Sequence, residues 1–444
     1  MNRIYKVIWS KVKNCYIVVS EIAKSHSKPV STKLNAGKTV AAVLAVAALC
    51  AGMTTSVMAA DQYYSVDDFG GRLASMGNKD NSGAKGIGSL AAGVGASVQS
   101  DGLYKGATAT VVGALNTVAI DTSSNTSAYD GVANSIVGVA NATQNANATL
   151  IFGAGNAVTN SYADVDLNLG NLDLSSPVAL SRQLGAAVGT SGGQVLVIGG
   201  ANSVDYARFS AVTGVSNTLN GADGNTSDYN FITGAKNTLT NTDSTYVIGS
   251  KNTVSDGSSN VVIGDNRKLT STTGNVVIGS ADDEMETTVS DATILGHNAN
   301  ATVADGVALG SKSVASVAKG VVGTVPTGTT VSDTDKATAT WTSTLGAISV
   351  GDTSKNLTRQ ITGVAAGTQA TDAVNVAQLN AVNTKVDNNA IHFFSVRGLS
   401  SQDNYSNSAA TGEKSIAIGA STRTQGHIGT ALGSDNTANA WGVP

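Results

Sequence analysis

A unit of about 15 residues recurs through the middle of this chain and limits its possible folds more than any other feature. Each copy carries three mostly apolar residues, a glycine, a small or polar residue and a further apolar one. From Gly234 to Gly310 the anchor glycines are separated by 15, 15, 15, 17 and 14 residues. This period is too short for a pair of helices and fits one coil of a stacked β-solenoid. The anchor glycines of the regular coils are Gly199, Gly214, Gly234, Gly249, Gly264, Gly279, Gly296 and Gly310.

The strands before these glycines are apolar on both faces. In the run Val276, Val277, Ile278, the first and third side chains point to one face of a strand and the second to the other. A strand with one solvated face alternates apolar with polar residues, whereas a strand buried on both faces does not. The interior of a thin coil covers one face only. We therefore expect chains to pack against each other along the second apolar face.

An asparagine often stands three positions after the glycine, as at Asn202, Asn217, Asn237 and Asn252. Asparagine tolerates the left-handed conformation and bonds its own backbone in turns, so we expect turn chemistry here. Stacked asparagines at equivalent bends also form hydrogen-bonded ladders. A row of polar ligand groups is a further, less economical interpretation.

Residues 1–60 have the layout of an extended signal peptide. A basic segment precedes an apolar run from Thr39 to Val57, and Met58, Ala59 and Ala60 offer a small-residue cleavage site. A membrane-spanning anchor is the alternative interpretation. Removal of this segment leaves 19 basic and 30 acidic residues, a net charge of −11, which disfavours a nucleic-acid partner. Both cysteines lie in the segment, so the mature chain has neither disulfides nor thiolate metal sites.

The remaining chain divides by composition. We expect a lead-in or cap over residues 61–84, solenoid coils over 85–323 and a loop-rich insert containing Trp341 over 324–346. Within the coils, residues 160–191 form an acidic insert that we expect to be a projecting loop. It lacks the spacing of known calcium loops, although cation binding is an alternative. Trp341 is expected to fill an interface, with carbohydrate stacking as the alternative.

Residues 347–390 change from a strand period to a helical one, and residues 391–444 restart the coils. Asn375, Leu379, Val382 and Val386 are spaced by 4, 3 and 4 residues, a short heptad-like seam with one polar layer. Asp372 lies where the cap of this helix is expected. A single helix of this length is not stable in isolation, so the seam also indicates association between chains.

Three stretches resemble the trimeric autotransporter adhesins, whose heads are of the YadA-like type. They are the signal peptide MNRIYKVIWSKVKNCYIVVSE, the neck-like RQITGVAAGT (359–368) with TDAVNVAQL (371–379), and the repeat SIAIGASTRTQG (415–426). The segment from Pro326 to Trp341 is similar to the head-insert motif of that family. The resemblance implies an all-β head of left-handed parallel β-roll, trimeric, on a short coiled-coil neck and stalk. It marks as neck residues Asp372, Asn375, Val376, Leu379 and Val382.

The resemblance further implies a homotrimer on the cell surface or outer membrane that binds a host or bacterial receptor. The family's C-terminal β-barrel anchor is not recognisable in this sequence, which leaves surface anchoring open. No catalytic residues, cofactor or metal site are predicted. The alternatives are a passive surface spacer and a polysaccharide-acting enzyme on a solenoid. For the enzyme, the densest acidic cluster is Asp282, Asp283, Glu284 and Glu286, which we expect to be a solvated turn.

Overall fold

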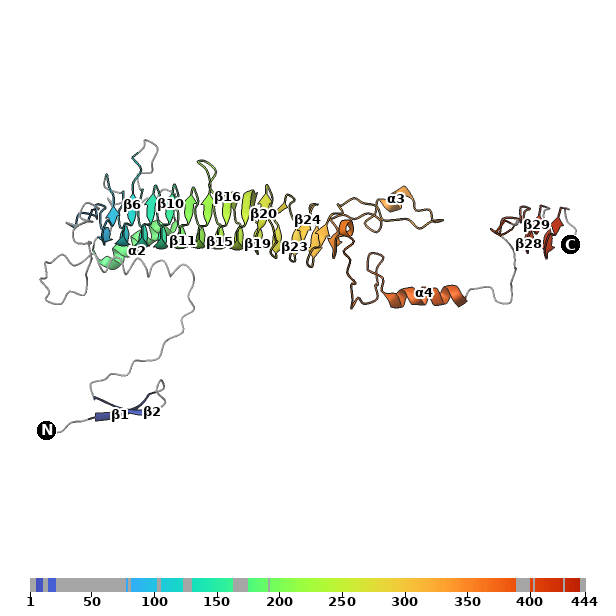
Figure 1. Cartoon of the computed structure of the whole chain (residues 1–444), viewed down its shortest axis with the longest axis horizontal. Coiled ribbons are helices and arrows are strands. Elements are labelled where there is room, and N and C mark those ends of the chain that lie inside the picture. Colours follow the sequence, from blue (N-terminus) through green and yellow to red (C-terminus); the bar gives the residue numbers. More distant parts are fainter. Residues whose placement is uncertain are drawn as a thin grey trace. The chain divides into compact units, whose positions relative to one another are not determined.

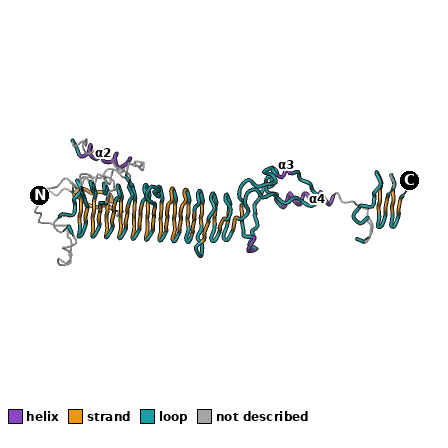
Figure 2. Tube along the Cα trace, turned by 90° about the horizontal axis from the view of Figure 1, so that it is seen from above, coloured by secondary structure: helices purple, strands orange, loops and turns teal. Residues whose placement is uncertain are grey.

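The computed structural model describes residues 5–10, 15–20, 77–78, 81–101, 105–122, 130–162, 175–190, 192–388, 400–401, 404–425 and 428–439. It divides into two compact units, residues 1–359 and 360–444. In the first unit a regular stack of coils runs from β3 to β27 (Figure 1). Each regular coil contributes one strand to each of two parallel sheets, which confirms the parallel β-solenoid predicted from the repeat. Figure 2 shows the coils edge-on as evenly spaced rungs.

The first sheet has 13 parallel strands and carries the anchor glycines. Val197, Val212 and Ile232 pair in register along it, and Gly199, Gly214 and Gly234 do the same. Its strands are β3 (Leu90–Ala92), β5 (Thr110–Ala114), β7 (Ser135–Val139), β9 (Leu150–Ala154), β11 (Leu196–Gly200), β13 (Ala211–Val215), β15 (Phe231–Ala235), β17 (Tyr246–Ser250), β19 (Val261–Ile263), β21 (Val276–Ile278), β23 (Thr293–Leu295), β25 (Val307–Leu309) and β27 (Ile348–Ser349).

The second sheet has ten parallel strands that follow the bend after each glycine. Its strands are β4 (Ser97–Val98), β6 (Thr117–Ala119), β8 (Ala142–Gln144), β10 (Ala157–Thr159), β12 (Ser203–Asp205), β14 (Thr218–Asn220), β16 (Thr238–Asp243), β18 (Thr253–Ser258), β20 (Arg267–Thr270) and β22 (Met285–Thr287). A parallel pair, β24 (Asn300–Ala301) and β26 (Val314–Ala315), follows in the next coils.

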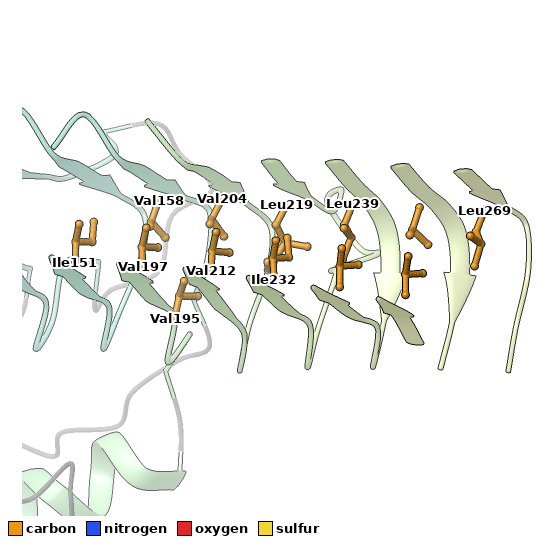
Figure 3. Packing of buried hydrophobic residues seen from close by; sticks show 14 of the residues in the cluster. Ile151, Val158, Val195, Val197, Val204, Val212, Leu219, Ile232, Leu239 and Leu269 are labelled. Carbon is orange, nitrogen blue, oxygen red and sulfur yellow. The ribbon is translucent and has the colours of Figure 1, made fainter. Parts of the chain in front are cut away.

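The core is a thin layer of aliphatic side chains between the two sheets. Figure 3 shows part of this core, with Val197, Val212 and Ile232 of the first sheet facing Val204, Leu219 and Leu239 of the second. All of these side chains are fully buried or nearly so. Branched residues of moderate size suit this position, because the two sheets of so thin a coil leave room for one layer only.

The insert at residues 160–191 differs from the projecting loop that we expected. Its described part contains helix α2 (Pro177–Thr190), and Leu184 and Ala187 pack against the buried Ala107 and Val132 of the solenoid. Leu180, Leu184 and Val188 have helical spacing in the sequence. The acidic residues before them are instead typical of a loop. Helix α2 therefore covers a corner of the N-terminal coils, as Figure 1 also shows.

A short α-helix, a further strand and a turn of 3₁₀ helix follow the last coils of the first unit. Helix α3 (Asp333–Lys336) lies in the insert at residues 324–346, and the stack then resumes with β27 pairing to β25. A turn of 3₁₀ helix, η4 (Thr353–Lys355), comes before the second unit.

The second unit holds helix α4 (Val376–Asn388) and a further pair of parallel two-stranded sheets. These pair β28 (Ile416–Ile418) with β30 (Thr430–Leu432), and β29 (Arg423–Thr424) with β31 (Thr437–Ala438). Strands β1 (Tyr5–Ser10) and β2 (Cys15–Ser20) of the N-terminal segment pair antiparallel. In the part of the chain that the structure describes, no helix combines the length and apolarity needed to cross a bilayer.

Candidate assembly face, asparagine ladder and neck

The outer surface of the first sheet is apolar, and we call it the apolar face. In β17 the inward Val247 is completely buried, whereas Tyr246 and Ile248 on either side are 47% and 52% exposed. The pattern recurs in most coils, although the outward residues beside Val212 in β13 are Ala211 and Thr213. The exposed large side chains of this face include Leu90, Phe152, Ile198, Phe231, Tyr246, Ile248, Ile263, Ile278, Leu295, Leu309 and Ile348. A row of this kind is typical of an interface rather than of a free surface.

Two aromatic rings on the apolar face stack on each other. Phe231 and Tyr246 occupy neighbouring strands in register, with ring centroids 5.1 Å apart and planes inclined by 5°. A second stacked pair, Phe209 with Tyr229, lies at the corner that leads into this sheet. Parallel in-register strands place equivalent side chains about 4.8 Å apart, so aromatic residues in one column stack without rearrangement.

The anchor glycines stand in one column where adjacent backbones come too close for any side chain. A Cβ atom at Gly234 would lie 1.8 Å from the carbonyl oxygen of Gly249, and the glycine has φ +140°. The equivalent contacts continue from Gly199 to Gly296, each against the glycine of the following coil. The predicted glycines from Gly199 to Gly296 therefore share one structural role, which is close packing of coil on coil at the first bend, whereas Gly310 lies against the Arg359 side chain.

The asparagines after these glycines form a buried ladder inside the coils. Asn237 Nδ2 donates to Asn217 Oδ1 at 2.9 Å and to the Gly249 carbonyl at 2.7 Å, and its backbone N–H also donates to Asn217 Oδ1. The left-handed residue of the bend is the one before, Lys236. Our turn-chemistry interpretation was therefore wrong in its detail. The ladder residues are Asn116, Asn141, Asn156, Asn202, Asn217, Asn237 and Asn252, each at most 1% exposed.

Arg267 ends the ladder, and sequence reasoning missed it. Its backbone N–H donates to Asn252 Oδ1, and its Nε donates to the Gly279 carbonyl at 2.6 Å, as an asparagine would. The guanidinium then reaches past the next coil, where Nη1 donates to the Ala299 carbonyl and Nη2 to the Gly296 carbonyl. Burial without a carboxylate partner lowers the pKa of Arg267. The available signal was an arginine at the ladder position, three residues after Gly264.

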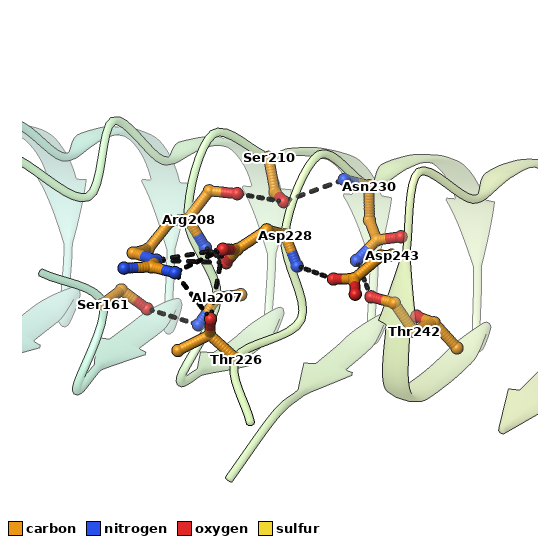
Figure 4. A network of polar contacts seen from close by, with 9 residues as sticks. All are labelled: Ser161, Ala207, Arg208, Ser210, Thr226, Asp228, Asn230, Thr242 and Asp243. Carbon is orange, nitrogen blue, oxygen red and sulfur yellow. Dashed lines mark hydrogen bonds and ion pairs between the residues drawn. The ribbon is translucent and has the colours of Figure 1, made fainter. Parts of the chain in front are cut away.

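A polar network joins the corners of the coils on the side of Arg208 (Figure 4). Arg208 makes a two-pronged ion pair with Asp228, with Nη2 to Oδ2 at 2.6 Å, and this contact raises the pKa of Arg208. The backbone N–H of Asp228 in turn donates to Asp243 Oδ1 in the next coil. Side chains thus tie successive corners together where the backbone ladders of the sheets are interrupted.

The predicted neck residues fall into two groups. Asn375 Oδ1 accepts from the N–H of Gln378 at 3.0 Å and so caps α4, while its Nδ2 donates to the Val364 carbonyl. Asp372 does not cap the helix as expected; its Oδ2 accepts from the N–H groups of Thr368 and Gln369, which lower its pKa. Val376, Leu379 and Val382 lie on α4 and are 72%, 55% and 56% exposed.

The acidic cluster considered for an enzyme lies on the surface. Lys268 Nζ pairs with Glu286 at 3.3 Å and Glu284 at 3.7 Å, and Asp282 contacts His297 Nε2 at 3.2 Å. Among the residues that the structure describes, no group of three or more His, Cys, Asp or Glu could hold a metal ion.

Comparisons with known protein families match two separate segments of the chain. Residues 1–50 match the family of the extended signal peptide of the type V secretion system. Residues 360–398 match the coiled stalk of trimeric autotransporter adhesin. In these two segments the chain is similar to the trimeric autotransporter adhesins.

Two curated members of this family share short, highly similar segments with the chain. The autotransporter adhesin BadA of Bartonella henselae is 69% identical over 42 residues, 10% of this chain and 1% of BadA. The trimeric autotransporter adhesin AtaA of Acinetobacter sp. (strain Tol 5) is 57% identical over 56 residues, 12% of this chain and 2% of AtaA. The matched segments are therefore very small parts of these relatives. The extended signal peptide and the similarity to these adhesins indicate that the chain is exported to the cell surface.

Proposed function

We propose that the chain is one protomer of a homotrimeric adhesin head that attaches the cell to host cells, extracellular matrix or other bacteria. The observation that carries this proposal is the apolar face of the first sheet. Half-exposed aliphatic and aromatic side chains recur along this face from Phe152 to Leu309, and no described part of the single chain covers them. Packing of three such faces around one axis would bury it.

The neck supports the same assembly. Leu379, Val382 and Val386 are all more than half exposed on a 13-residue helix. An isolated helix of this length with an uncovered apolar seam is only marginally stable in water. Pairing with the same helix of two further chains would cover the seam and join the three solenoids at their C-terminal ends.

Attachment would then rest on repetition rather than on one deep pocket. A trimer presents each surface three times, and linked weak contacts gain affinity because the second and third bind at high effective concentration. The outward face of the second sheet and its corners would be available for contact. These surfaces are polar, since hydroxyl, amide and charged side chains alternate there with the buried core residues.

Display of the chain on a non-adherent cell tests the function. The full chain would be fused to a heterologous trimeric anchor, and attachment would be measured against cultured cells, matrix proteins and bacteria of the same kind. A gain in attachment or aggregation over cells with the anchor alone is expected. A displayed, trimeric head that promotes neither would contradict adhesion and favour the passive spacer. Saccharide cleavage that is lost on Asp283→Ala would instead favour the enzyme.

A further inference from the structure

A second row of polar side chains lies at the corner that follows the second sheet, separate from the asparagine ladder. Asn145 Nδ2 donates to Asn160 Oδ1 at 3.0 Å, and Asn160 Nδ2 donates to Asp205 Oδ1 at 2.9 Å. Asp130 occupies the position equivalent to Asn145 one coil earlier, because the β7–β9 pairing relates residues by an offset of 15. The row therefore consists of two amides between two aspartates: Asp130, Asn145, Asn160 and Asp205.

Asp205 sets the direction of every hydrogen bond in this row. An ionised carboxylate only accepts, so Asn160 must turn its NH₂ group toward Asp205 and its oxygen toward Asn145. Asn145 must then turn its own NH₂ group toward Asn160. Its oxygen is left facing the N-terminal side of the row, where it needs a donor from the preceding coil.

The preceding coil places the Asp130 carboxyl group here, and a carboxyl group can donate to Asn145 Oδ1 only when it is protonated. Asp130 is completely buried and Asn145 is 5% exposed. Among the residues that the structure describes, Asp130 Oδ1 and Asn145 Oδ1 are both buried without a side-chain hydrogen-bond partner. Two unpaired oxygens at equivalent places in adjacent coils cost free energy, of the order of 1–3 kcal/mol for each such group. A proton on Asp130 would form one hydrogen bond between the two oxygens, so neither would remain unpaired.

We propose that the Asp130 carboxyl keeps its proton in mildly acidic surroundings, donates it to Asn145 Oδ1, and so acts as a pH-sensitive latch on the N-terminal coils. When the proton is lost, two acceptors face each other and the row opens at its first member. Val132, two residues further on, belongs to the surface on which Leu184 and Ala187 of α2 pack. Acidification thus tightens the coils that hold this helix.

The surroundings of Asp130 favour the neutral form. Burial raises the pKa of Asp130 from 3.8 to about 6, although the backbone N–H of Asp121, which donates to Oδ2, the Lys105 ammonium and the backbone N–H groups of Ala146 and Asn145 oppose the shift. Lys105 is already engaged, donating to the Asp121 carbonyl at 3.0 Å and pairing with Asp101 at 3.4 Å. A carboxyl whose folded pKa is raised stabilises the fold at low pH, and this stabilisation is lost as pH rises through about 6.

Hydrogen exchange of the full chain tests the latch. In residues 131–149 the opening equilibrium, corrected for intrinsic exchange rates, should increase about tenfold between about pH 5 and about pH 7.5. Asp130→Asn supplies a permanent NH₂ donor to Asn145. It should remove this pH dependence and give, at about pH 7.5, the protection that the wild type shows at about pH 5. A wild type without the dependence, or an Asp130→Asn variant that retains it, would overturn the proposal.

A second variant acts from the other end of the row. Asp205→Asn supplies a donor there, which lets Asn160 and Asn145 reverse so that Asn145 Nδ2 faces an ionised Asp130. This variant should also lose the pH dependence, by lowering the pKa of Asp130. The matched control is Asp256→Asn, because Asp256 accepts from Asn241 at the same corner of later, exposed coils and should leave the dependence intact.

Calcium chloride alone, added at about pH 7.5, separates a proton from a cation. If it protects residues 131–149 in the wild type and not in Asp130→Asn, the two unpaired oxygens hold a cation and the proton latch is wrong. No change with calcium supports the latch. Neither result depends on whether the head is adhesive.

Discussion

The two sheets of the solenoid share one core and differ on their outer faces. Val247 in the first sheet and Leu239 in the second are both fully buried. Outside, the neighbours of Val247 are Tyr246 and Ile248, whereas the neighbours of Leu239 are Thr238 and Thr240. Within a coil, only the inward residue of each strand packs in the core. The outer residues are therefore free to specify what each sheet meets, and we infer a second chain for the first sheet and solvent or a receptor for the second.

Among the substitutions considered, charges on the apolar face should have the largest effect, and that effect should be on the oligomeric state. The double substitution Ile248→Lys and Ile263→Lys places two ammonium groups per chain where the proposed interface is most regular. Desolvating unpaired charges is costly, so the head should dissociate to single chains, as measured by light scattering.

The matched control uses the same coils on the other sheet. Thr240→Lys and Ser255→Lys add the same charge to outward positions of β16 and β18, and should leave the oligomeric state unchanged. If both double variants dissociate, or neither does, the two faces do not differ in the way proposed.

Loss of one rung of the asparagine ladder should have a smaller effect, because it acts inside the coil that both sheets share. Asn237→Leu removes the donor to the Gly249 carbonyl and the acceptor for the backbone N–H of Asn252. Leaving these groups buried and unpaired should lower the free energy of unfolding by about 2–4 kcal/mol, measured by denaturant unfolding.

Asn241→Gly is the comparison, since Asn241 lies at an exposed corner, its side chain bonds Asp256, and glycine accommodates its left-handed conformation at φ +50°. Its effect should stay below about 1 kcal/mol. Equal effects at Asn237 and Asn241 would mean that the ladder is not the source of stability.

The smallest effect is expected from making the polar face resemble the apolar one. Thr240→Val keeps the branched shape of an outward strand residue and removes one hydroxyl. The free energy of unfolding should change by less than about 0.5 kcal/mol, and the oligomeric state should not change. Thermal unfolding and light scattering at matched concentrations measure both, and a shift to larger assemblies would show that one hydroxyl is enough to keep this face from associating.

The sequence was sufficient for the coil but not for its interior. The spacing of the glycines and the doubly apolar runs predicted a parallel solenoid and an uncovered face, because strand geometry assigns alternate residues to opposite sides. The same reasoning did not separate a turn asparagine from a buried ladder. The two differ by the direction of one side chain at a bend, which depends on the left-handed conformation of the residue before it, as at Lys236.

Local patterns also failed where distant segments meet. Helix α2 was interpreted as loop because its acidic neighbours dominated the composition, and its apolar stripe has meaning only against Ala107 and Val132. Arg267 is a second case, because its position in the repeat does not by itself show that the side chain is buried. Its burial follows because the next two coils have no asparagine at the ladder position, where Asp282 and Ala299 stand instead, so Arg267 donates to the Gly279 and Gly296 carbonyl groups.

The amino-acid sequence by itself determined the repeat, the inward and outward sides of each strand and the change to a helical period at the neck, since each depends on residues close together in the chain. Only the tertiary structure decided which polar groups share a row. Stacking brings residues 15 to 46 positions apart into hydrogen-bonding contact, as in Asn145 with Asn160 and Asn160 with Asp205. Whether a buried carboxyl has a donor is a property of that stacked neighbourhood, which the order of residues along the chain does not express.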